Sequence, residues 1–492
     1  MKNLFKLTGI AALLLMGVGC SEEFLEEKPT EFLTTDQIAE AAEKNPDVVA
    51  GTLNGIYALM IETGTGGTTN HDDFGHKGYD IYGDMLSGDM ALSVSTYGWY
   101  RSDITEFQAP QDFTRTRNYM VWRYYYRIIR SANTVIDALG GNDAIPELEE
   151  NQRIMGQAKA IRAHSYFYLI QYFTKEYAPD ALVLPIYDDL QDQNGPKVPM
   201  SEIFALIESD LNSAITLLEG FNRGNKTQIN KYVAEAMLAY VYGFKGNQWQ
   251  EVYNLTSDVI NNGGFTLMSS EEVLGGFNDL STSGWMWGVD LTLDNELGLV
   301  SWWGQVDRFT YSYAWAGDAK AIDSGLYAQI PDNDVRKLQF KAPTGGYADL
   351  MPLDKFYDPA RSIGGQSPVT TDYVFMRVAE MYLLNAEAAA HIGQDAITPL
   401  KTLLSQRIPD VTYLDALSGQ ALMDEIYLQT RIELWGEGKS YLALKRNKGT
   451  VVRGANHLSF VGESIPYNDE RLTFEIPEAE ILYNPFIDSQ NP

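Results

Sequence analysis

Two consecutive stretches near the middle of the sequence place the strongest limits on the fold. Residues 229–247 (INKYVAEAMLAYVYGFKGN) and 249–264 (WQEVYNLTSDVINNGG) indicate two antiparallel helices joined at Gly246. Small and bulky side chains are interleaved in the first helix, at Ala234, Ala236, Ala239, Tyr240 and Tyr242. Small and large residues that interlock between stacked helices are typical of tetratricopeptide units. The pair therefore predicts a scaffold of stacked helical hairpins.

Other segments extend this scaffold. The clearest is 201–220 (SEIFALIESDLNSAITLLEG), which Ser201 is placed to cap and Gly220 to end. Its apolar side chains repeat at helical spacing and form one stripe: Ile203, Leu206, Ile207, Leu211, Ala214 and Leu218. Further helices are expected in residues 118–139, 154–173, 373–393 and 422–446. The sequence thus predicts a mainly α fold whose repeats are irregular.

Long insertions separate the helical segments. Residues 63–111 are rich in Gly, Thr and Asp, and residues 266–370 show strand-like alternation that Gly and Pro interrupt. We expect one domain over residues 37–492. Its helical scaffold covers about 40–62, 112–265 and 371–447, and small β elements lie in the insertions.

The N-terminal residues are those of an exported protein. Residues 1–19 combine Lys2 and Lys6 with a short apolar run, which is typical of a signal peptide and too short to span a bilayer. Ordinary signal peptidase and lipoprotein processing both fit the small residues before Cys20. Because Cys20 is the only cysteine, it cannot form an internal disulfide, and we interpret it as a lipidation site. Residues 20–36 then form a lipidated acidic tether.

The charge and aromatic content limit the possible partners. The formal net charge is −29, which repels phosphate backbones, so nucleic acid is not an expected partner. Aromatic residues make up 12% of the chain, with 30 Tyr and 9 Trp. This content is high for a soluble protein and needs an explanation.

Motifs in a fixed order along the chain resemble a known family, the SusD-like (RagB/SusD) nutrient-binding lipoproteins of the Gram-negative outer membrane. The resemblance begins with Cys20 and the FLEEKP stretch that follows it. It continues through WRYYYRIIRSANTVI (122–136), AKAIRAHSYFYLIQYF (158–173), LVLPI (182–186), VPMSEIFALIESDLNSAI (198–215), FMRVAEMYLLNAEA (375–388), RIELWGEGKSYLALKR (431–446) and FEIPEAEILYNP (474–485). Together these motifs cover essentially the whole chain.

The resemblance implies a fold, a location and a partner. The fold would be a tetratricopeptide-like scaffold whose loops and small strands form a ligand face. The protein would be a lipid-anchored, surface-exposed component of the outer membrane. It would bind oligosaccharides without catalysis or cofactor and deliver them to a SusC-like TonB-dependent transporter.

Glycan binding directs attention to aromatic residues in loops. Flat rings with polar side chains at their edges suit the C–H faces and hydroxyl rims of sugars. One candidate group lies in the first insertion: Trp99, Tyr100, Arg101 and Asp103. The other lies in the second insertion, near Asp307 and Arg308: Trp302, Trp303, Tyr311, Tyr313 and Trp315.

Several conspicuous residues are expected to be structural. Trp285 and Trp287 alternate like one face of a strand and are expected in the core, and the helical Trp122 and Trp249 are expected in the core or in packing between helices. A loop cluster of His71, Asp72, Asp73 and His76 matches no standard metal-site spacing, so no metal is expected. Charged residues on the late helices favour inter-helix ion pairs over catalysis: Arg377, Glu380, Glu387, Arg431, Glu433 and Glu437.

Other functions stay open at this point. The same architecture could take up a peptide or another oligomer. A surface glycoside hydrolase would need two carboxylates about 5–9.5 Å apart, and no local motif indicates such a pair. A helical-repeat adaptor without a small ligand would leave the loop tryptophans unexplained.

Overall fold

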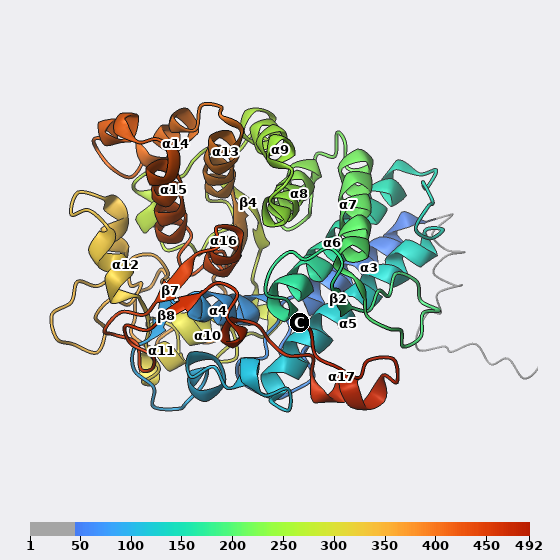
Figure 1. Cartoon of the computed structure of the whole chain (residues 1–492), viewed down its shortest axis with the longest axis horizontal. Coiled ribbons are helices and arrows are strands. Elements are labelled where there is room, and N and C mark those ends of the chain that lie inside the picture. Colours follow the sequence, from blue (N-terminus) through green and yellow to red (C-terminus); the bar gives the residue numbers. More distant parts are fainter. Residues whose placement is uncertain (1–44) are drawn as a thin grey trace, which may run out of the picture.

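A computed structural model of the protein describes residues 45–492, so the predicted signal peptide, Cys20 and the whole predicted tether lie outside the described residues. The predicted mainly α class is confirmed, because helices dominate this part of the chain (Figure 1). The helices of the scaffold are α3 (Pro46–Leu59), α5 (Thr116–Ala138), α6 (Glu149–Phe173), α7 (Met200–Leu217), α8 (Lys231–Lys245), α9 (Trp249–Asn262), α13 (Val378–Ile392), α14 (Ile397–Leu404), α15 (Gly419–Glu433) and α16 (Ser440–Arg446).

The predicted helical hairpin is present as α8 and α9. Asn230 caps α8 by accepting from the Val233 amide at 3.1 Å, and Gly246 ends it with a φ of 71°. Successive helices then stack in chain order: α5 on α6, α6 on α7, α7 on α8, α8 on α9, and α9 on α13. Figure 1 shows this array along the upper and right-hand parts of the molecule.

Eight short strands pair into two-stranded antiparallel sheets in the described part of the chain. The pairs are β1 (Met90–Leu92) with β5 (Lys320–Ile322), β2 (Leu182–Leu184) with β3 (Val198–Pro199), β4 (Trp285–Val289) with β6 (Tyr373–Arg377), and β7 (Thr450–Val452) with β8 (Ser464–Pro466). The first pair matters most for function, because it joins the two insertions with Ala91 opposite Ala321.

The first insertion contains a core helix that the sequence did not predict. Helix α4 (His76–Leu86) is buried along its whole length and packs against α16. Its glycines permit close packing, since a Cβ added at Gly83 would lie 3.1 Å from the Tyr441 Cβ atom. Gly and charged residues gave this segment the pattern of a loop. The remaining helices are short: α10 (Trp302–Val306), α11 (Tyr313–Ala316), α12 (Ser324–Gln329) and α17 (Glu478–Tyr483).

The late helices carry a buried network of charges. Glu433 accepts from Arg377 at 3.1 Å, from Arg407 at 2.9 Å and from Arg336 at 3.2 Å. Burial alone would raise the pKa of Glu433, but Arg407 and Arg377 hold it well below its ordinary value. The remaining predicted charges are paired as well: Arg377 with Glu437, Arg431 with Asp89, Glu387 with Arg446 and Glu380 with Lys439. The expected ion pairing is therefore confirmed.

The predicted structural roles of these tryptophans are confirmed. Trp285, Trp287 and Trp122 are buried, and the half-buried Trp249 of α9 packs between helices, stacking on His391 of α13 at 3.9 Å between ring centroids. Among the described helices, none is both long and apolar enough to cross a bilayer.

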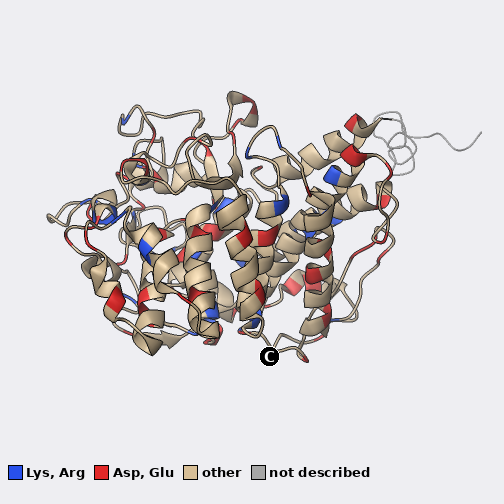
Figure 2. Ribbon diagram, turned by 90° about the horizontal axis from the view of Figure 1, so that it is seen from above, with Lys and Arg blue, Asp and Glu red and all other residues tan. Residues whose placement is uncertain are grey.

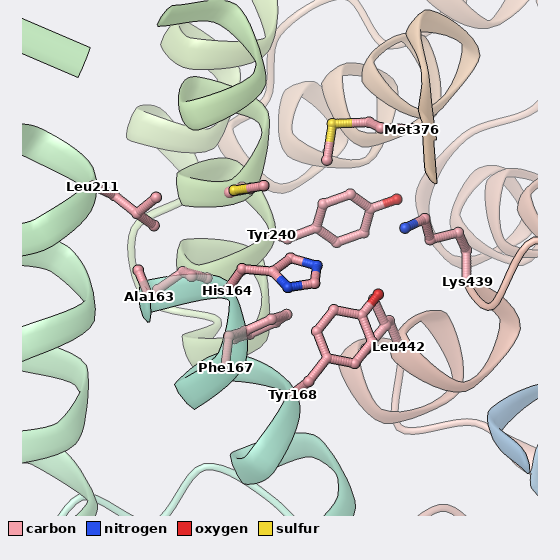
Figure 3. A pocket seen from close by; sticks show the side chains of 11 residues that line it. Ala163, His164, Phe167, Tyr168, Leu211, Tyr240, Met376, Lys439 and Leu442 are labelled. Carbon is pink, nitrogen blue, oxygen red and sulfur yellow. The ribbon is translucent and has the colours of Figure 1, made fainter. Parts of the chain in front are cut away.

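A small internal cavity lies between α6, α8 and α16 (Figure 3). Its lining includes His164, Tyr168, Tyr240 and Lys439, and its volume of about 20 Å³ holds roughly one water molecule. Burial lowers the pKa of His164 well below its ordinary value, so this imidazole is neutral. The cavity is a packing defect of the core and is too small for a ligand.

Candidate ligand-binding surface

The two aromatic regions predicted from the sequence form one continuous surface. The loop that follows β1 and the loop that precedes β5 lie side by side, because Leu92 at the end of β1 pairs with Lys320 at the start of β5. The buried carboxylate of Asp318 accepts from the backbone amides of Thr96 at 2.6 Å and Tyr97 at 2.9 Å. The Thr96 amide also lies 3.1 Å from the Gly317 carbonyl oxygen. These bonds fix the loop of Trp99 against the loop of Trp315.

Trp99 lies at the centre of this surface. Its half-buried indole stacks on the imidazole of His71, with 5.2 Å between centroids and 4° between planes. Tyr313 meets the same indole edge-on at 6.1 Å, and its hydroxyl lies 2.6 Å from His71 Nδ1. The guanidinium of Arg117 lies 5.8 Å from the Trp99 ring centroid. The orientation of the indole is therefore held from several sides.

Three rings on this surface are exposed to solvent. Tyr97 is 57% exposed, Tyr311 48% and Trp315 41%. Tyr311 and Trp315 adjoin at 5.4 Å between centroids, and Tyr97 contacts Tyr313 at 5.3 Å. The Trp315 indole rests on Gly364, where a Cβ would lie 2.8 Å from the ring. Glycine at this position thus allows the indole to lie flat on the backbone.

Four of the predicted aromatic ligand residues are buried, and this corrects the expectation that they present rings to a ligand. Tyr100, Trp302 and Trp303 are 1–2% exposed, and Tyr313 is also buried. Tyr100 packs edge-on against Tyr82 at 5.6 Å. Trp302 and Trp303 lie on α10, whose first turn is inside the core, so Trp302 packs on Phe356 at 4.6 Å. Adjacent positions on so short a helix can both be buried, which sequence spacing does not reveal.

Arg101 and Asp103 occupy the edge of the surface. Both belong to a π-helical turn, Arg101–Thr105. Arg101 is exposed and pairs with Glu106 at 3.2 Å, whereas Asp103 is buried and accepts from Arg117 at 3.1 Å. Arg101 is therefore accessible to a ligand, and Asp103 serves to orient Arg117.

Two residues that sequence reasoning missed support the surface from below. The Gln305 carboxamide donates to the His71 carbonyl at 2.8 Å and accepts from the Lys320 ammonium at 2.8 Å. Lys320 is fully buried, and this burial lowers its pKa to about 7 although Asp318 acts in the opposite direction. Neither residue carried a sequence signal, because their proximity depends on the pairing of β1 with β5.

The acidic loop near His71 has structural roles. Asp72 accepts from Arg117 at 2.9 Å and from the Tyr82 hydroxyl at 2.8 Å. Asp73 accepts from the amides of Gly66 and Thr68, and His76 contacts the Tyr125 hydroxyl. Within residues 45–492, no three His, Cys, Asp or Glu side chains gather as metal ligands.

Sequence comparisons place the chain among proteins of one family. A SusD-like family model described as starch-binding and associating with the outer membrane matches residues 24–242, and a SusD family model matches residues 318–485. SusD-like protein P25 of Formosa agariphila is 23% identical over 287 residues, which are 58% of this chain. The chain spans about half the length of that relative, 51%.

Solved structures share the fold. A SusD-like carbohydrate binding protein from Bacteroides vulgatus is 26% identical with a TM-score of 0.74, covering 89% of this chain and 96% of that one. A SusD superfamily protein from Bacteroides thetaiotaomicron is 24% identical with a TM-score of 0.71, covering 91% of this chain and 99% of that one. The predicted tetratricopeptide-like architecture is thereby confirmed.

Proposed function

This chain belongs to the SusD-like family, and we propose from that premise that it binds oligosaccharides at the cell surface without catalysis. Membership of this family supports glycan binding in nutrient uptake. The bound glycan would then pass to a SusC-like TonB-dependent transporter, and lipidation of Cys20 would hold the protein on the outer membrane.

The observation that supports binding is the group of exposed rings, Tyr97, Tyr311 and Trp315, around Trp99. Soluble proteins seldom leave several large aromatic rings exposed together, and such patches mark interaction sites. Sugars present C–H faces that stack on rings and hydroxyl groups that pair with polar edges. The exposed Arg101 and the guanidinium of Arg117, which lies 5.8 Å from the Trp99 ring centroid, supply such an edge.

The carboxylates of the surface favour binding over hydrolysis. Asp72 and Asp103 accept from Arg117, and the Asp318 carboxylate accepts from two backbone amides. A glycosidase needs one carboxyl group protonated and one carboxylate facing the scissile bond. The alternative of a peptide ligand uses the same rings, and it differs in requiring donors and acceptors for a peptide backbone.

The direct test is a titration of the full chain in a non-glycosidic detergent with a panel of neutral and acidic oligosaccharides. Tryptophan fluorescence and calorimetry report binding, and chromatography of the oligosaccharides reports cleavage. Saturable binding without cleavage, weakened by Trp99→Ala, is the expected result. Binding only of peptides, or release of shorter sugars, would contradict the proposal.

A further inference from the structure

Arg308 occupies the same corner of the surface as the exposed pair of Tyr311 and Trp315. Its carbonyl oxygen accepts from the Gly364 amide at 3.0 Å, and Gly364 is the residue on which the Trp315 indole lies. Its guanidinium lies 5.9 Å from the ring centroid of Tyr347, whose hydroxyl donates to the Ala314 carbonyl at 2.7 Å. Arg308 is thus linked to the Trp315 loop through Gly364 at its backbone and through Tyr347 at its guanidinium.

The guanidinium of Arg308 lacks protein acceptors. Its Nε atom is buried without a hydrogen-bond partner, and the side chain makes no ion pair within residues 45–492. A guanidinium carries five N–H donors, and leaving a buried donor unpaired is unfavourable. The half-buried side chain is therefore held by its ring contact and not by a carboxylate.

The other arginines of this surface are paired differently. Arg101 pairs with Glu106 at 3.2 Å, Arg117 with Asp72 at 2.9 Å, and Arg361 with Asp354 at 2.7 Å. Acidic residues are spread over the whole fold (Figure 2), so a carboxylate partner would be easy to supply. Arg308 differs from these three arginines in that no ion pair to a carboxylate is present within residues 45–492, although the net charge of the chain is −29.

The neighbouring carboxylate does not neutralise Arg308. Asp307 is fully buried and accepts from the Phe309 amide at 2.9 Å, the Thr310 hydroxyl at 2.8 Å and the Asp358 amide at 3.1 Å. Burial raises the pKa of Asp307 to about 6 even with these donors. Its oxygens are committed to the loop, which leaves the guanidinium free for an external acceptor.

We propose that Arg308, Tyr311 and Trp315 form a subsite for an anionic saccharide unit, one that carries a carboxylate or a sulfate group. This inference rests on the proposed glycan-binding function and specifies the ligand class. The sugar ring stacks on the indole and phenol, and its oxyanion accepts from Arg308. A guanidinium binds carboxylate and tetrahedral oxyanions in a bidentate manner that an ammonium does not reproduce.

The negative net charge of the protein does not oppose this subsite at physiological salt. The Debye length there is about 8 Å, so distant carboxylates are screened while a contact charge is not. An anionic ligand can therefore bind this strongly acidic protein where a cationic side chain contacts it directly. Binding of this kind weakens as the salt concentration rises.

The test compares matched ligands on the full chain in a non-glycosidic detergent. Oligogalacturonates and alginate oligomers are titrated beside their methyl esters, which lack the charge, and sulfated galactan oligomers beside their desulfated forms. Arg308→Gln is compared with Arg361→Gln, an exposed arginine over the Tyr357 ring that is paired with the Asp354 carboxylate. Circular dichroism confirms that both variants are folded.

The expected result is binding of one acidic series at least about tenfold more tightly than its neutral counterpart, as loss of a charged hydrogen bond implies. Arg308→Gln removes that preference and its salt dependence, whereas Arg361→Gln retains both. Equal affinity for charged and neutral forms, or an unchanged preference in Arg308→Gln, would overturn the subsite and leave glycan binding standing. Failure of every oligosaccharide to bind would instead overturn the proposed function and the subsite together.

Discussion

The imidazole of His71 and the indole of Trp99 lie parallel, with 5.2 Å between their centroids and 4° between their planes. His71 is in turn fixed by the Tyr313 hydroxyl at its ring and by Gln305 at its carbonyl. A loop residue predicted to face the ligand is thus held by residues from the other insertion. Preorganisation of this kind lowers the entropic cost of binding.

Replacing His71 by alanine is expected to weaken glycan binding while Trp99 is still present. The stacked pair contributes about 0.5–1.5 kcal/mol, so affinity should fall by roughly two- to tenfold. Calorimetric titration of the variant checks this. His391→Ala is the matched control, because His391 stacks on Trp249 at 3.9 Å away from the aromatic surface. Equal losses in both variants would argue against a specific role for His71.

Two tryptophans only twelve residues apart should respond in opposite ways to truncation. Trp315 is exposed on the platform, so Trp315→Ala should reduce affinity about tenfold or more and change stability little. Trp303 is buried and donates to the Asp372 carbonyl at 3.3 Å, so Trp303→Ala should cost about 3–5 kcal/mol of folding free energy. Urea unfolding beside ligand titration separates the two effects. A stable Trp303→Ala variant that loses only binding would restore this residue to the ligand site.

Lys320 should make stability depend on pH. Burial lowers its pKa to about 7, whereas an unfolded lysine titrates near 10.4. At low pH the lysine is charged in both states, and burying the charged ammonium lowers the free energy of unfolding. The penalty is complete below pH 7 and disappears as pH rises from about 7 to about 10.4. The wild type should therefore gain stability relative to Lys320→Met across this window, on the order of several kcal/mol.

Urea unfolding of both proteins at pH 6, 8 and 9.5 measures the Lys320 effect. The difference between the two curves isolates this lysine, since other buried groups are common to both. The methionine leaves the Gln305 oxygen without its donor, but that cost does not change with pH. A difference that stays constant from pH 6 to pH 9.5 would show that Lys320 titrates normally.

The buried charge network should be sensitive to loss of one member. The Glu433 carboxylate forms ion pairs with Arg377, Arg407 and Arg336. Glu433→Gln leaves these three guanidinium groups without part of their compensating charge and should lower the free energy of unfolding by about 3–5 kcal/mol. The surface pair of Lys337 and Asp332 offers the control, because Asp332→Asn removes an ion pair in solvent and should have no measurable effect. Thermal unfolding of both variants gives the comparison, and a Glu433→Gln protein as stable as wild type would refute it.

The sequence was most informative where one periodic pattern spanned a whole element. Helices α7, α8 and α9 were predictable because apolar stripes, small residues and a Gly at the turn all agreed. Helix α4 was not, because its charged residues, among them Lys77, Asp80 and Asp84, are buried and bonded inside the core, whereas charged residues in a sequence indicate exposure to solvent. Its glycines also imitate a loop.

The site was predictable in composition and not in arrangement. Loop aromatics identified Trp99, Tyr311 and Trp315 as candidates, yet Trp302 and Trp303 were candidates on the same grounds, one of them expected to point inward, and both are buried. Burial depends on where a five-residue helix sits in the core, which is set by contacts distant in sequence. The pairing of three-residue strands β1 and β5 is too short to leave a pattern, so the merging of the two regions into one surface could not be foreseen.

The most direct test of the account is a calorimetric titration of the full chain and its Trp315→Ala variant, in a non-glycosidic detergent, with the oligosaccharide that binds best. The account predicts saturable binding to the wild type, weakened about tenfold or more in the variant, with an unchanged unfolding transition. Equal affinity for both proteins would contradict the claim that the merged aromatic surface is where the glycan binds.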